Sequence, residues 1–76
     1  MPLYLLTSVQ DVGYDCAAGF VVAAPDEAAA RDLAASKCGD EGREHWRSAL
    51  TTTCTRIAET STYTEPCIVL RDFNAG

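Results

Sequence analysis

The chain has 76 residues, of which 47% are hydrophobic, with eleven Asp and Glu against six Lys and Arg. This length allows a single domain, residues 1–76, with a small core. The net charge of −5 disfavours direct binding to the phosphate backbone of a nucleic acid. No apolar run reaches the roughly 18 residues of a membrane span, and residues 1–10 lack the features of a signal peptide. These features predict a soluble, intracellular protein with no membrane partner.

The first half of the chain predicts a β-hairpin. Residues 3–9 are mostly β-favouring and stop at polar Gln10, which is typical of a strand. Residues 11–19 hold two Gly and two Asp and predict an exposed connection, whereas residues 19–24 form a short apolar run of strand length. We expect the two strands to pair as antiparallel neighbours joined by a long loop.

A helix is predicted over residues 26–38. Asp26 is a good N-cap, Glu27 suits the positive end of the helix dipole, and an Ala-rich segment follows. Helical spacing predicts that the face toward the sheet carries Ala30, Leu33, Ala34 and Cys38, and that Arg31, Asp32, Ser36 and Lys37 are exposed to water.

The second half predicts a crossing segment and a second hairpin. Residues 39–47 are polar and suggest one turn of helix at 43–47, anchored by Trp46. Residues 51–59 and 67–70 have strand character and should pair with each other. The predicted fold class is α+β, a small antiparallel sheet in ββαββ order with one helix packed on one face. The expected core includes Leu5, Phe20, Val22, Leu33, Ile57, Ile68 and Leu70.

The four cysteines, Cys16, Cys38, Cys54 and Cys67, are widely spaced, with no C-x-x-C pair. His45 is the only imidazole, so the sequence predicts no metal site and mostly reduced, buried thiols. Cys54 and Cys67 are the exception, because the predicted second hairpin would place them opposite each other. They are the candidate disulfide pair.

Recognisable catalytic patterns do not occur in the sequence. Phosphate-binding glycine loops, H-E-x-x-H and calcium-loop spacings are absent, and His45 lies in the charged stretch GREHWR, which is typical of a surface position. A domain this small also offers little depth for a water-excluding pocket. We therefore expect no catalytic residue, no cofactor and no enzymatic activity.

Acidic residues in the predicted connections are the most informative side chains. One interpretation is a solvated surface that maintains solubility. The other is a negative surface that meets a basic groove on a partner protein, with Tyr14 and Tyr63 nearby. The candidate partner-binding residues are Asp11, Asp15, Asp40, Glu41, Glu59 and Glu65.

The segments YLLTSVQDVGYD, FVVAAPDEAAARDLA, CGDEG with the following Trp, and IVLRDFNAG together resemble very small phage or mobile-element proteins. Within that group the chain most resembles anti-CRISPR proteins directed at type I systems, with type I-C as one subtype. The resemblance implies a bacterial host cytoplasm and a Cas protein of the Cascade surveillance complex as partner. It also implies inhibition by occupying a surface that normally receives target DNA. The Cas subunit that we expect as partner is the large subunit that reads the protospacer-adjacent motif (PAM). Six basic residues dilute the acids, which favours blocking a local site over imitating a full duplex.

An alternative is a self-associating phage accessory or interaction protein with no Cas partner, although a monomer is the expected state. One helix covers only one face of a sheet, and we expect Tyr4, Leu6 and Val21 on the other face in this alternative.

Overall fold

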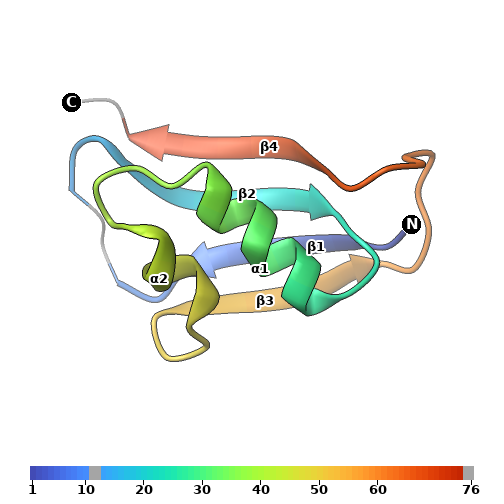
Figure 1. Ribbon diagram of the computed structural model, residues 1–76, viewed down its shortest axis with the longest axis horizontal. Helices are drawn as coiled ribbons and strands as arrows, with labels where there is room; N and C mark the ends of the chain where they lie inside the picture. Colours follow the sequence, from blue (N-terminus) through green and yellow to red (C-terminus); the bar gives the residue numbers. More distant parts are fainter. Residues whose placement is uncertain (11–12, 75–76) are drawn as a thin grey trace.

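The computed structural model describes residues 1–10 and 13–74 of the chain. Within them, a four-stranded antiparallel sheet carries two helices on one of its faces (Figure 1). Neither helix is long and apolar enough to cross a membrane. In chain order the elements are β1 (Leu3–Ser8), β2 (Cys16–Ala23), α1 (Glu27–Ser36), α2 (Arg43–Arg47), β3 (Thr52–Ala58) and β4 (Cys67–Asn74).

The helix start was predicted correctly. The Asp26 carboxylate accepts a hydrogen bond from the Ala29 amide at 2.8 Å, which satisfies one of the free donors of the first turn. The helical turn at residues 43–47 is also confirmed as α2, and its Trp46 side chain is fully buried. The sheet is therefore covered by two helices, where the sequence predicted one and a crossing segment.

The strand order is β3-β1-β2-β4, which confirms the first hairpin and contradicts the second. β3 pairs with β1, with Leu6 opposite Cys54, and β4 pairs with β2, with Val22 opposite Ile68. The two apolar strands β1 and β2 each gain a hydrogen-bonded neighbour on both sides in this way. The connection at residues 59–66 consequently runs across the end of the sheet from one edge to the other (Figure 1).

The core lies between the sheet and the helices and is built around Trp46. The indole ring meets the Phe20 ring edge to face at 4.9 Å, and Tyr4, Leu6 and Val22 complete the buried layer. Small side chains on α1 let the helix backbone approach the sheet closely. The residues that α1 contributes to the core are Ala30, Ala34 and Ala35.

The predicted core was only partly correct, because β1 faces the opposite way. Tyr4 and Leu6 pair with Val22 and Phe20 on the helix-covered face, so Leu5 points to the other face, consistent with side-chain alternation along a strand. Phe20 and Val22 are buried as expected. Of the remaining expected core residues, Leu33 and Ile68 are half-buried beside the core, whereas Leu5, Ile57 and Leu70 are exposed.

Arg31 is buried, only 7% exposed, although the sequence predicted an exposed side chain. Its guanidinium pairs with Glu27 at 2.9 Å and donates to the carbonyl oxygens of Trp46 and Ser48 and to the Thr52 hydroxyl at 2.7 Å. These acceptors lie at the end of α2, after it and at the start of β3. Arg31 thus joins α1 to the chain segment that leads into the β3 edge.

We predict that Arg31→Met lowers the free energy of unfolding by about 2–4 kcal/mol, because buried acceptors lose their donors. The matched control, Arg43→Met, replaces an exposed arginine at the start of α2 and should change stability by less than about 0.5 kcal/mol. Urea denaturation followed by Trp46 fluorescence measures both. Equal stability of the two variants would contradict the role given to Arg31.

The candidate disulfide pair does not form. Cys54 lies on β3 and Cys67 on β4, the two edges of the sheet, and all four cysteines are free. Two intervening strands separate them by about 14 Å at the usual strand spacing, whereas bridged cysteines need Cα atoms within about 7 Å. Burial and the nearby Glu27 carboxylate raise the pKa of the Cys54 thiol, which favours its unreactive, protonated form.

Mild oxidation of the folded protein should therefore give no linkage between Cys54 and Cys67. Peptide mapping by mass spectrometry after alkylation measures this directly, with denatured protein oxidised in parallel as the control. A Cys54–Cys67 peptide recovered from the folded protein would contradict the strand order.

Candidate functional site

Two connections of the chain and the end of one strand meet at one end of the sheet. The loop before β2, the loop between α1 and α2, and the end of β4 converge there (Figure 1). The Asp15 amide donates to the Asn74 carbonyl at 2.6 Å, and the Asp40 amide donates to the Asp15 carbonyl at 2.7 Å. Asp15 has a positive φ of 59°, a conformation that Asp and Asn tolerate better than most residues. Two acidic residues far apart in sequence thereby become neighbours.

Gly39 is required at this junction because neighbouring segments of the chain lie too close to it to leave room for a side chain. A Cβ atom at this position would overlap the Asp15 carbonyl oxygen and would lie 2.8 Å from Cε1 of Phe73. Both separations are shorter than van der Waals contact, and the Asp15 oxygen belongs to the backbone and cannot move aside easily. The glycine allows the α1–α2 loop to lie directly against the start of β2.

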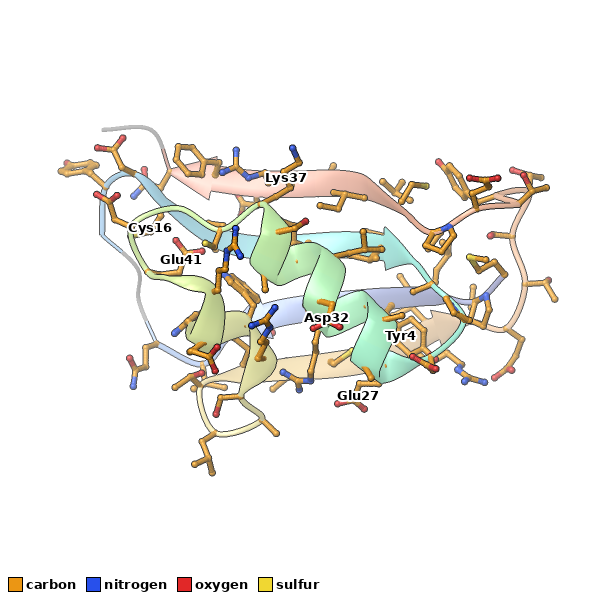
Figure 2. All side chains as sticks on the ribbon, viewed as in Figure 1. Tyr4, Cys16, Glu27, Asp32, Lys37 and Glu41 are labelled. Atoms are coloured by element: carbon orange, nitrogen blue, oxygen red, sulfur yellow. The ribbon has the colours of Figure 1, made fainter. Side chains whose placement is uncertain are left out.

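Glu41 holds the same junction from inside. Its Oε1 accepts hydrogen bonds from the Ala17 amide at 3.1 Å and the Gly39 amide at 2.8 Å, and its Oε2 accepts from the Trp46 indole at 2.5 Å. Figure 2 shows Glu41 at the end of the molecule where Cys16 begins β2. One carboxylate therefore links β2, the α1–α2 loop and α2.

The environment of Glu41 favours its charged form. Burial acts to raise its pKa, but the hydrogen bonds from the Trp46 indole and from the Glu41, Ala17 and Gly39 amides outweigh burial. Together they hold the pKa of Glu41 below its ordinary value of 4.5. Glu41 is thus a structural anion and its charge is already used within the protein.

Of the predicted partner-binding acids that lie within the described residues, the structure brings the exposed side chains of Asp15 and Asp40 together. Beside them, Tyr14 is 74% exposed. We call this set, Tyr14, Asp15 and Asp40, the acidic tip. Acidic groups and an exposed aromatic ring on one projection are suited to contact with a positively charged protein surface.

The other predicted acids lie elsewhere. Glu59 and Glu65 belong to the connection between β3 and β4, at the opposite end of the sheet (Figure 1), and Glu59 already pairs with Arg56 at 3.0 Å. Glu41 supports the tip from within. Asp11 lies outside the described residues. The predicted set of six therefore divides into an acidic tip, one structural residue, a distal pair and one position that the structure does not describe.

Basic groups also lie close to the tip. The Arg71 guanidinium stacks over the Phe73 ring at 4.0 Å and donates to the Lys37 carbonyl at 2.9 Å. Because Phe73 adjoins Gly39, this cation stands next to the tip. The negative surface is consequently local and bounded, which matches the dilution of acids expected from the sequence.

His45 is the other side chain whose chemical type could serve in catalysis or metal binding. Its Nε2 lies 2.9 Å from the Ser8 hydroxyl, and its ring meets Trp46 edge to face at 5.4 Å. The Ser8 hydroxyl also donates a hydrogen bond to the Gln10 carbonyl at 2.9 Å, and when it does so the His45 Nε2–H is the donor to the Ser8 oxygen. In that arrangement the imidazole contributes a hydrogen bond to Ser8 and an edge-to-face contact with the Trp46 ring. Within residues 1–10 and 13–74, no cluster of His, Cys, Asp and Glu is arranged to hold a metal ion.

Sequence analysis missed the role of Glu41, although a signal was present. A buried tryptophan needs an acceptor for its indole N–H, and a carboxylate five residues before Trp46, within G-D-E-G, is a natural candidate.

Comparison of the chain with known protein families, with curated proteins and with solved structures finds no match.

We predict that Glu41→Gln destabilises the protein at pH 7 and that this difference shrinks as the pH falls. The folded-state pKa of Glu41 is depressed, so its contribution to stability is present above about pH 4.5 and is lost as the pH falls through the folded-state pKa. Urea denaturation at pH 7 and pH 3 measures the difference.

The matched control is Glu44→Gln, which neutralises an exposed carboxylate paired with exposed Arg47. This variant should be close to wild type at both pH values. A pH-independent deficit in Glu41→Gln would contradict the charged role of Glu41.

Proposed function

We propose that the protein is a non-catalytic inhibitor that binds a basic, DNA-receiving surface of a partner protein through its acidic tip. The observation that carries this proposal is the junction of two connections with the end of β4, which fixes Asp15 and Asp40 side by side at one end of the sheet. The backbone hydrogen bonds that join Asp15 to Asn74 and Asp40 to Asp15 reduce the conformational freedom that the tip would lose on binding. The net charge of −5 adds long-range attraction to such a surface.

The distribution of acids supports local blocking in preference to imitation of a whole duplex. Duplex DNA carries about one charge per 1.7 Å of axis, a dense and regular array. Here the tip and the distal pair lie toward opposite ends of a molecule 33 Å long, with Arg71 next to the tip. Such a surface can occupy one binding position for DNA phosphates but cannot follow a strand.

The partner we propose is a Cas protein of a type I Cascade complex, with the large subunit that reads the protospacer-adjacent motif favoured. This assignment rests on the resemblance of the chain to small phage-encoded anti-CRISPR proteins and on the need for a basic DNA-binding surface. The protein would then act stoichiometrically in the cytoplasm of a bacterial host. No cofactor and no direct contact with nucleic acid are required.

The test compares two double variants that each remove two negative charges. Asp15→Asn with Asp40→Asn neutralises the tip, and Glu59→Gln with Glu65→Gln neutralises the distal connection. Asn is suited to the positive φ of position 15. In a competition assay with purified type I Cascade and labelled target DNA, the tip variant should inhibit at least about tenfold less strongly than wild type.

The distal variant should inhibit nearly as well as wild type, because its two neutralised charges lie at the opposite end of the sheet from the tip (Figure 1). It has the same net charge as the tip variant and therefore controls for overall charge. Circular dichroism verifies that both variants are folded. Equal loss in both variants would show that overall charge acts without a defined site. Absence of any binding to Cascade, by wild type at low salt, would contradict the proposed partner.

A further inference from the structure

The sheet has one face that neither helix covers. Both helices lie on the same side of the sheet (Figure 1), and the α1 and α2 contributions to the core all pack against that side. Strand alternation assigns the remaining face. Leu5, Val21 and Leu70 point to it because their neighbours Leu6, Phe20 and Arg71 are directed to the helix side.

These side chains form a continuous row across all four strands. In register, Thr55 of β3 lies opposite Leu5 of β1, Leu5 lies opposite Val21 of β2, and Val21 lies opposite Leu70 of β4. Leu5 is 37% exposed and Leu70 is 58% exposed. The row is apolar over three adjacent strands, which is unusual for a sheet face left in water.

The adjacent row adds small and polar side chains without much charge. Thr53 and Thr7 are linked by a 2.6 Å hydrogen bond between their hydroxyls, and Gly19 and Asp72 continue the row. Asp72 is the single charged residue among the described residues that the strand register assigns to this face. A face with so little charge, on a chain of charge −5, does not match a basic partner surface.

The dimensions of the face suit a dimer. The molecule measures 33 × 23 × 17 Å, and the sheet spreads in the plane of the two longer dimensions (Figure 1). A rectangle of those sides is the upper limit for the uncovered face, and it is close to the roughly 800 Å² per partner that a standard-size protein interface buries. Two flat sheets of this kind can pack face to face about 10 Å apart, as in a β-sandwich.

We infer that a second copy of this chain packs on the uncovered sheet face, with the apolar row of Leu5, Val21 and Leu70 buried in a twofold interface. Self-association fits because the face is apolar in its middle and nearly neutral, so that it complements itself without bringing many like charges together. The acidic tip lies at the end of the sheet and stays outside this interface. The inference departs from the monomer expected from the sequence and is independent of the proposed Cas partner.

The first experiment is sedimentation equilibrium of the full-length protein over a wide concentration range. Wild type should associate from a monomer of 8.1 kDa to a dimer. Leu5→Lys and, separately, Leu70→Lys should weaken the dimer at least about tenfold, because each places a charge within the apolar row that the interface buries. Leu70 lies on an edge strand and is more exposed, so its variant retains the fold even if Leu5→Lys does not.

The matched control is Leu50→Lys, which changes an 89% exposed leucine in the loop between α2 and β3. It should dimerise like wild type. A wild-type protein that stays monomeric at millimolar concentration, or a dimer that survives Leu70→Lys, would overturn the inference.

Isotope-filtered NMR on a mixture of labelled and unlabelled protein gives an independent readout. Intermolecular contacts should involve the methyl groups of Leu5, Val21 and Leu70. Contacts confined to the backbone amides of β3 or β4 would instead indicate pairing between sheet edges and would overturn the face-to-face arrangement.

Discussion

The candidate site depends on the hydrogen bonds that the Glu41 carboxylate accepts. The carboxylate accepts hydrogen bonds from β2, from the α1–α2 loop and from the Trp46 indole, and Trp46 is also the centre of the core. The same group therefore fixes the position of the acidic tip and the packing of α2. Because it is a charged acceptor with several donors, its loss would affect both the fold and the surface. Arg31 has the corresponding role at the other side of α2, through acceptors in the segment that leads into β3.

Features with local causes could be predicted from the sequence. The N-cap at Asp26, the first hairpin and the buried Trp46 each follow from a few neighbouring residues. Features set by distant contacts could not. In β1 several consecutive residues are apolar, so the sequence does not show which alternate side chains face the core. The sequence therefore predicted Leu5 in the core, whereas the structure buries Leu6.

The same limit explains the errors in topology and in the site. β4 pairs with β2 and not with β3, and no local sequence pattern indicates this pairing. The acceptors of Arg31 are largely backbone carbonyls, which carry no sequence signal. Acidic composition indicated a charged surface correctly in kind, but only the fold shows that Asp15 and Asp40 are adjacent while Glu59 and Glu65 lie far away. The fold thus separates a charged end from a nearly neutral sheet face, and the two surfaces suit different kinds of partner.

The most direct measurement of the central claim is an NMR titration of labelled protein with the unlabelled large subunit of a type I Cascade complex. Substoichiometric additions should broaden the amide signals of residues 13–17 and 39–42 first, and target DNA bound beforehand should prevent the broadening. Signals of residues 59–66 should change little under the same conditions. Broadening centred on the 59–66 connection, or binding that persists with DNA already in place, would contradict a blocking role for the acidic tip.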